Sequence, residues 1–167
     1  MTATAPTTTA HPPVAGDRAP DFSLQSTAGT TVRLSQLRGA SPVLLAFFPL
    51  AFTSTCTAEL CEFNENFDQF AGKGVVVLPV SVDSVPTLKE FKAKYAMKTE
   101  LLSDFKREAS RAWGVLREET FFSERAYFLV DRDGSFAGRT SNRSSATSAT
   151  TVSCSIGSPR LAERLAA

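Results

Sequence analysis

The chain is poor in histidine. Its 167 residues include one histidine, His11, and three cysteines, Cys56, Cys61 and Cys154. A Cys-His protease or acyltransferase needs an imidazole beside its thiol, and a structural zinc site needs converging Cys and His ligands. Because His11 lies far from the cysteines in the sequence, both classes are disfavoured. No two cysteines have the C-x-x-C spacing, which argues against a thioredoxin-type disulfide oxidoreductase.

The chain also lacks an excess of charge and any long apolar run. It has 18 Lys and Arg against 17 Asp and Glu, so neither nucleic acid nor an anionic membrane surface is indicated as a partner. No run approaches the length of a transmembrane helix. The first residues have no basic start or apolar core, so they do not read as a secretory signal. We therefore expect a cytoplasmic protein with reduced or reactive cysteines.

Apolar residues alternate between two periods along the middle of the chain. Runs typical of buried strands are followed by stretches with helical spacing, and a hairpin pattern precedes them. The predicted order is a hairpin over 22–34, a strand over 42–49, a helix from Ser54 to about residue 71, a strand over 75–83, a helix over 85–97, a link at 101–105, a helix over 106–115 and a final hairpin from residue 126. This order predicts an α/β fold, a thioredoxin-like sandwich with a central mixed sheet, helices on both faces and an N-terminal hairpin.

The two ends of the chain have a different composition. Residues 1–15 are rich in Thr, Ala and Pro and read as a disordered tail. Residues 139–167 are dense in Ser and Thr and have no apolar period until the last eight residues. We therefore divide the chain into a tail (1–15), one domain (16–138) and an atypical C-terminal segment (139–167).

Cys56 occupies a position that suits a nucleophile. The predicted strand ends at Pro49 and the next helix begins near Ser54, so Cys56 lies in the first turn of a helix at the carboxyl end of a central strand. Reaction sites in α/β sheets favour that edge, and the positive end of the helix favours a thiolate. Without an imidazole, such a thiolate fits attack on an O–O bond, which converts the sulfur to a sulfenic acid. The alternative is that Cys56 is a small buried apolar residue.

An ordered set of short motifs carries a resemblance to the peroxiredoxins. "PLAFTSTC" has the P-x-x-x-T-x-x-C pattern of that family, and "TAE" extends it to C-x-x-E. "APDF", "VSVDS", "LLSD" and "ERAYFLVDRDG" resemble the same family in the same order, between Ala19 and Gly138. The chain is most similar to the actinobacterial alkyl hydroperoxide reductase E group, and its C-x4-C spacing resembles the bacterioferritin comigratory protein, or Q-type, group.

The resemblance implies a role for five residues. Cys56 matches the peroxidatic cysteine, and Thr53 matches the threonine whose hydroxyl contacts the peroxide. Pro49 matches the proline that shields the thiolate, Arg125 the arginine that holds the thiolate and the peroxide oxygens, and Glu59 the glutamate that orients this arginine. Read without the resemblance, Arg125 is a surface residue at a strand end and Thr53 is a helix N-cap.

Cys61 is a candidate resolving cysteine. It lies five residues after Cys56, a helical rise of roughly 7.5 Å, whereas a disulfide needs Cα atoms within about 6.8 Å. If Cys61 reacts with the sulfenic acid, the helix must therefore unwind first, as the resemblance to the Q-type group implies. The alternative is that Cys61 belongs to the core. Cys154, in the atypical segment, is a poor candidate for any role.

The resemblance also implies an activity and its partners. We expect a thiol-dependent peroxidase that reduces hydrogen peroxide and organic hydroperoxides in antioxidant defence, with no metal or organic cofactor. The expected reductant is thioredoxin, mycoredoxin or a low-molecular-weight thiol, and the expected assembly is a homodimer. Two alternatives stay open: a peroxide-sensing or chaperone-like protein that uses the same thiol, and an impaired enzyme from a damaged gene.

The C-terminal segment prompts the second alternative. The resemblance stops near Gly138, where family members continue with a charged stretch and a closing helix. GC-rich codons for "RTSNRSSATSAT" can encode a charged stretch in another frame, so we hypothesise a frameshift that deprives the fold of an edge strand and its last helix.

Overall fold

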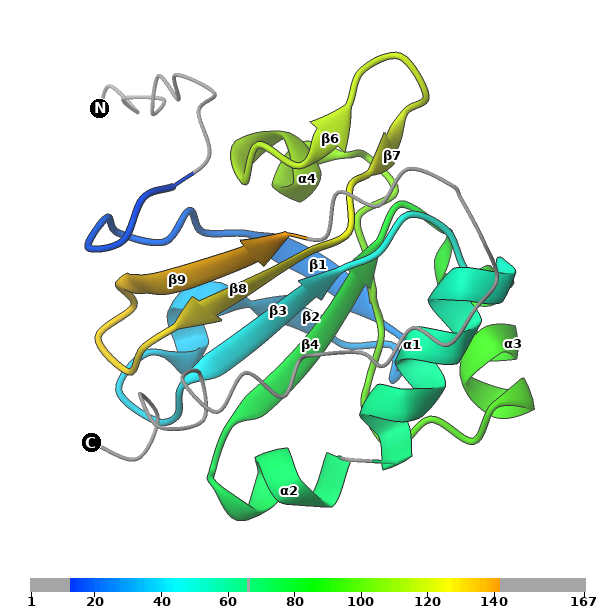
Figure 1. Ribbon diagram of the computed structural model, residues 1–167, viewed down its shortest axis with the longest axis horizontal. Helices are drawn as coiled ribbons and strands as arrows, with labels where there is room; N and C mark the ends of the chain where they lie inside the picture. The colour runs from blue at the N-terminus through cyan, green and yellow to red at the C-terminus, as the bar shows by residue number, and fades with distance from the viewer. Residues whose placement is uncertain (1–12, 66, 142–167) are drawn as a thin grey trace.

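The computed structural model describes residues 13–65 and 67–141, and these form a mixed sheet with helices around it (Figure 1). The strand order of the main sheet is β2-β1-β5-β4-β3-β8-β9, and β6 and β7 form a separate pair. The strands are β1 (Ser23–Ser26), β2 (Thr31–Arg33), β3 (Val43–Phe47), β4 (Val76–Ser81), β5 (Leu102–Ser103), β6 (Leu116–Arg117), β7 (Phe122–Ser123), β8 (Ala126–Val130) and β9 (Phe136–Ser141). The helices are α1 (Ser54–Glu65), α2 (Phe67–Gly72), α3 (Val85–Lys94), α4 (Glu108–Ala112) and the 3-10 helix η1 (Leu34–Leu37).

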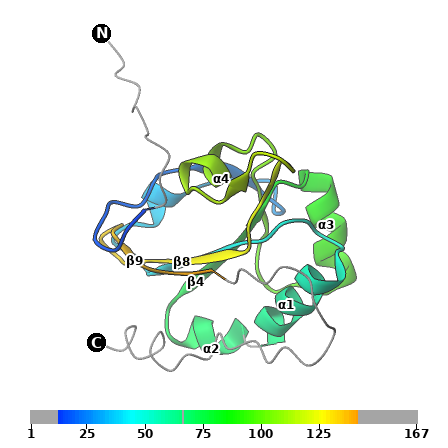
Figure 2. The ribbon, with the colours of Figure 1, turned by 45° about the horizontal axis from the view of Figure 1, so that its top comes forward.

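The central strands are apolar on both faces because helices cover both. All five residues of β3 are buried, and alternate residues belong to different clusters: Val43, Leu45 and Phe47 to one, Leu44 and Ala46 to another. Figure 2 shows α4 on one side of the sheet and α1 and α2 on the other. The predicted thioredoxin-like sandwich is therefore confirmed.

The order of connections also follows the prediction. β3 pairs in parallel with β4 across the α1–α2 crossover, and in antiparallel fashion with β8, which continues into β9. The N-terminal hairpin pairs Ser23 with Arg33, and its turn contains Gly29 at a φ of 81°, a left-handed conformation that glycine adopts without strain. In the predicted third helix, Trp113 is fully buried at the C-terminal end of α4.

Two parts of the secondary structure differ from the prediction. The expected link at 101–105 contains β5, which pairs in parallel with β4 and in antiparallel fashion with β1 and so joins the hairpin to the main sheet. A strand of two residues is too short to show an apolar period in the sequence, and the same holds for β6 and β7. The predicted helix from Ser54 to about residue 71 is two helices, α1 and α2. The apolar period continues across the break, so the pattern alone indicated one helix.

The ends of the described part reach beyond the domain expected at 16–138. Residues 14–17 form a turn in which the Asp17 amide donates to the Val14 carbonyl, and the Gly16 amide donates to the Phe136 carbonyl at 2.9 Å. At the other end β9 runs to Ser141, so an edge strand is present there. Residues 1–12, with His11, and residues 142–167, with Cys154, lie outside the described residues. The frameshift stays a hypothesis.

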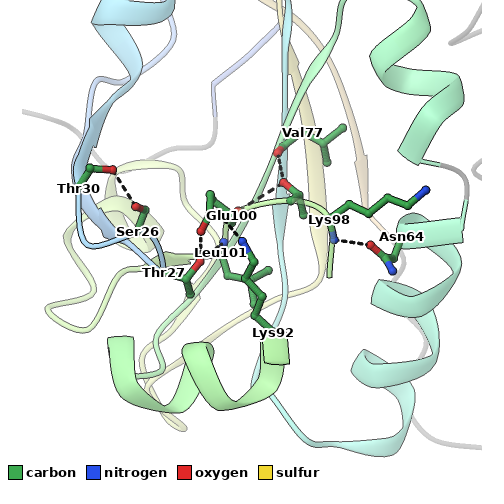
Figure 3. A network of polar contacts seen from close by, with 10 residues as sticks. Ser26, Thr27, Thr30, Asn64, Val77, Lys92, Lys98, Glu100 and Leu101 are labelled. Atoms are coloured by element: carbon green, nitrogen blue, oxygen red, sulfur yellow. Dashed lines mark hydrogen bonds and ion pairs between the residues drawn. The ribbon is translucent and has the colours of Figure 1, made fainter. Parts of the chain in front are cut away.

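A polar network ties three parts of the fold together (Figure 3). Glu100 accepts hydrogen bonds from Thr27 in the hairpin turn and from Lys92 in α3. Beside it, the Asn64 side chain of α1 donates to the Ala96 carbonyl at 3.1 Å and accepts from the Lys98 amide at 2.6 Å. The hairpin, α3 and the C-terminal end of α1 are therefore held to the same connection, residues 95–101.

No helix in the described part of the chain is long and apolar enough to cross a membrane.

Candidate active site

Cys56 lies at the carboxyl end of the central strand β3. The chain leaves β3 after Phe47, passes through a loop of residues 48–53 and enters α1 at Ser54, so Cys56 is the third residue of the helix. The first turn of a helix has unpaired N–H groups and the positive end of the helix dipole. Cys56 is only 2% exposed. The thiol is thus held in an electropositive position, with little access to water.

Arg125 lies against this thiol although the two residues are 69 positions apart in the chain. Its Nη2 donates to the Cys56 sulfur at 3.2 Å. The register of the sheet explains the meeting: Ala126, the first residue of β8, pairs with Phe47, the last residue of β3. Arg125 therefore reaches the same edge of the sheet as the start of α1. A guanidinium here provides a fixed positive charge and several N–H donors beside the sulfur.

Glu59 fixes the other side of the guanidinium. Its Oε2 lies 2.5 Å from Arg125 Nε, an ion pair in which the two side chains are 17% and 15% exposed. Glu59 follows Cys56 by three residues, so the two side chains share one face of α1. The structure thus brings together Cys56, Glu59 and Arg125, and the catalytic roles that the resemblance implies for them stay a prediction. This geometry leaves further Arg125 donors for an oxygen atom next to the sulfur.

Thr53 and Pro49 lie in the loop that precedes the helix. The Thr53 carbonyl accepts from the Thr57 amide at 2.9 Å, the first bond of α1, so the backbone of Thr53 occupies the N-cap position. Its hydroxyl instead donates to the Leu50 carbonyl at 3.1 Å. Because the hydroxyl proton is used in this bond, the oxygen keeps its lone pairs for an incoming donor. Pro49 is half-buried, two residues after β3.

Two residues that hold this loop were missed from the sequence. Asp83, just after β4, accepts a hydrogen bond from the Ala51 amide at 2.7 Å. Ser123, in β7, donates to the Phe48 carbonyl at 2.9 Å. Asp83 belongs to the "VSVDS" motif, and polar residues after a parallel strand often face the site at that edge, a signal that could have identified it. Ser123 had no such signal, because its contact with Phe48 depends on the position of β7, a strand that the sequence did not predict.

Cys61 lies beside an apolar cluster to which α3 contributes. It is partly buried against the cluster that contains Leu60, Leu88 and Phe91, and both Cys56 and Cys61 are free thiols. Burial raises the pKa of Cys61 above its ordinary value, and the negative charge of Glu65 raises it further. In an intact α1, the five-residue separation keeps the two sulfur atoms apart. Within residues 13–65 and 67–141, no three His, Cys, Asp or Glu side chains gather as potential metal ligands.

A family model and two related proteins match the same part of the chain. The family model described as "AhpC/TSA family" matches residues 15–137. Alkyl hydroperoxide reductase E of Mycobacterium tuberculosis is 39% identical over 121 residues, which cover 71% of this chain and 79% of that protein. Peroxiredoxin Bcp of Escherichia coli is 36% identical over 130 residues, which cover 74% of this chain and 83% of that protein.

Solved structures share the same architecture. Peroxidoxin BcpB from Mycobacterium tuberculosis superposes with a TM-score of 0.74 at 31% identity, over 81% of this chain and 89% of that chain. A PrxQ variant from Xylella fastidiosa superposes with a TM-score of 0.72 at 27% identity, over 77% and 86% of the two chains.

Proposed function

Since the chain belongs to the AhpC/TSA family of peroxiredoxins, which are thiol peroxidases, we propose that it reduces hydrogen peroxide and organic hydroperoxides through a sulfenic acid at Cys56. The observation that carries this proposal is the contact of Arg125 with the Cys56 sulfur, held by the Glu59 ion pair. A buried sulfur with a fixed cation and free N–H donors suits a reaction in which negative charge moves from sulfur to oxygen.

The reaction follows from the donors and acceptors around the sulfur. The Cys56 thiolate attacks one peroxide oxygen, the O–O bond breaks, and the sulfur becomes a sulfenic acid. The second oxygen leaves as alkoxide or hydroxide and takes a proton from water, so the sulfur loses the two electrons that the peroxide gains. Arg125 stabilises the charge on the oxygens. Thr53 accepts the peroxide O–H, because its own proton is bound to Leu50.

Pro49 and Glu59 have supporting roles in this proposal. The ring of Pro49, in the loop before α1, limits the access of water to the thiolate. Glu59 holds the guanidinium of Arg125 beside the sulfur, a role that the 2.5 Å ion pair supports. Preorganised donors of this kind do not have to reorient during the reaction, which is the source of their catalytic effect.

We propose Cys61 as the thiol that resolves the sulfenic acid. Its sulfur attacks the sulfenic sulfur, a disulfide forms and water leaves. This step requires α1 to unwind between the two residues, since a helical separation of five residues exceeds disulfide reach. An external reductant of the thioredoxin, mycoredoxin or low-molecular-weight thiol class then restores both thiols. A cytoplasmic setting and a homodimer complete the proposal.

Mass spectrometry after one equivalent of hydrogen peroxide tests both the oxidation of Cys56 and its resolution by Cys61. The expected wild-type product has lost two hydrogens, and Cys61→Ser accumulates a sulfenic acid that dimedone traps. Cys56→Ser is expected to leave the peroxide unconsumed. Sulfenic acid in the wild type as well would remove Cys61 from the proposal and indicate an external thiol. Unreacted Cys56 in folded protein would overturn the proposed function. Repeated turnover with a reductant distinguishes an enzyme from a peroxide sensor.

A further inference from the structure

We propose that Asp83 and Ser123 are positioning residues for the loop of residues 48–53, which carries Pro49 and Thr53. The inference rests on the proposed function, and it assigns neither residue a contact with the peroxide. Their role is to fix the Thr53 hydroxyl relative to the Cys56 sulfur and to Arg125. We call residues 48–53 the peroxidatic loop.

Asp83 holds the middle of the peroxidatic loop. Its Oδ2 accepts two hydrogen bonds, from the Ala51 amide at 2.7 Å and from the Ser81 hydroxyl at 2.8 Å. The backbone of Asp83 is itself fixed: its amide donates to the Ser81 oxygen at 3.2 Å, and its carbonyl accepts from the Ser103 hydroxyl at 2.6 Å. Asp83 is therefore held at the ends of β4 and β5 through Ser81 and Ser103. Its carboxylate in turn fixes the backbone of Ala51.

Ser123 holds the start of the same loop. Its side chain is fully buried, and its hydroxyl donates to the Phe48 carbonyl at 2.9 Å. Ser123 precedes Arg125 by two residues, so this bond connects the peroxidatic loop with the segment that carries the guanidinium. The amide of Glu124, between them, donates to the Val115 carbonyl at 2.6 Å and fixes that segment in turn.

The loop needs these external bonds because its own conformation is strained. Phe52 has a φ of 64°, a left-handed conformation that is strained for a residue with a large side chain. Its ring packs edge-to-face on Phe91 of α3 with centroids 5.2 Å apart. Thr53 follows directly. Without the bonds to Ala51 and Phe48, we expect the loop to relax toward conformations of lower strain and so to change the position of Thr53.

The reaction with peroxide should be sensitive to such a movement. A misplacement of about 1 Å can cost roughly 100-fold in rate when two groups must align on one substrate. Alkylation of Cys56 by iodoacetamide does not use the Thr53 hydroxyl. The ratio of the two rates therefore reports the position of the loop, whereas a general loss of structure changes both.

The experiment compares four variants with the wild type under identical conditions. Asp83→Ala and Ser123→Ala each remove one bond to the loop, and Asp83→Asn keeps an oxygen that can accept from Ala51 and Ser81. Asp104→Ala is the matched control, because Asp104 also accepts from backbone amides, those of Ala109 and Ser110, but binds α4. For each protein the rate constants for hydrogen peroxide and for iodoacetamide are measured, together with the fraction folded.

We expect Asp83→Ala and Ser123→Ala to react with peroxide about 10- to 100-fold more slowly, with alkylation within about twofold of the wild type. Asp83→Asn should recover most of the loss, and the folded Asp104→Ala control should keep the wild-type rate. Wild-type peroxide rates in both alanine variants would overturn the inference. An equal fall in both reactions, or the same loss in the control, would also overturn it. A wild-type protein that does not react with peroxide would instead overturn the proposed function.

Discussion

Arg125 uses two different nitrogen atoms for two contacts, whereas a lysine has one. Its Nη2 faces the Cys56 sulfur at 3.2 Å while its Nε pairs with Glu59 at 2.5 Å. A lysine has the same charge but a single ammonium group. We expect Arg125→Lys to lower the second-order rate constant for hydrogen peroxide by about 100-fold, the usual effect of losing a preorganised donor. Stopped-flow measurement of the first turnover gives this constant.

Arg111→Lys provides the control for this substitution. Arg111 pairs with Glu118 at 3.0 Å on the surface, where both side chains are more than half exposed, so the same replacement there should leave the rate unchanged. If Arg125→Lys reacts as fast as the wild type, charge alone is sufficient and the simultaneous contact with Cys56 and Glu59 has no catalytic role.

While α1 is wound, Cys61 is expected to react with iodoacetamide more slowly at neutral pH than an ordinary thiol does, and faster as the pH rises. Burial and the charge of Glu65 raise its pKa above the ordinary 9.0, and a thiol reacts with iodoacetamide as its thiolate. In a Cys56→Ser background, the alkylation rate should therefore rise through a midpoint above pH 9.0. Glu65→Gln should lower this midpoint in part, since burial is the larger cause. A midpoint below 9.0 would contradict the buried environment of Cys61.

At the scale of elements, α1 is held at both ends. Arg125 contacts its first turn, and Asn64 bonds its last turn to Ala96 and Lys98. These bonds stabilise the wound helix, and each such bond is worth about 0.5–1.5 kcal/mol. Because a Cys56–Cys61 disulfide requires unwinding, Asn64→Ala should convert sulfenic acid to disulfide several times faster, with the peroxide step unchanged. Quenched-flow alkylation and mass analysis follow the two steps separately.

Lys98→Ala is the matched control for Asn64. It removes the exposed ion pair between Lys98 and Asp68 of α2 but keeps the Lys98 amide that binds Asn64. Its rate of disulfide formation should equal that of the wild type, because exposed ion pairs contribute little. An unchanged or slower rate in Asn64→Ala would show that unwinding does not extend to the last turn of α1.

The elements also differ in how far the sequence could predict them. β3, β4 and β8 are apolar runs of five or six residues, long enough to show burial on both faces. β5 to β7 have two residues each, and they are defined by pairing with strands elsewhere in the chain: β5 with β1 and β4, and β6 with β7. The same holds within the site. Cys56 and Thr53 lie in one motif, whereas Ser123 meets Phe48 only through the fold, so no local pattern marks it.

At the scale of the whole molecule, Glu100 connects segments that are distant in the chain. It binds Thr27 of the hairpin turn and Lys92 of α3 (Figure 3). The hydrogen bond from Lys92, and then that from Thr27, lower the pKa of Glu100 below its ordinary 4.5. The folded state therefore binds this proton less readily than the unfolded state. The stabilisation that the carboxylate provides is complete above pH 4.5 and is lost as the pH falls through the lowered pKa.

Glu100→Gln removes the carboxylate and with it this dependence of stability on pH. Urea unfolding between pH 7 and pH 3 measures the free energy of unfolding of both proteins. We expect the variant to be less stable than the wild type at pH 7, with a difference of about 1 kcal/mol or less because Glu100 is 40% exposed. The difference should shrink as the pH falls below 4.5, where the wild-type carboxylate also becomes protonated. Glu118→Gln, which alters a surface pair between neighbouring segments, should change the stability less at every pH. A Glu100→Gln difference that persists at pH 3 would mean that shape and packing, rather than the charge of Glu100, join the hairpin to α3.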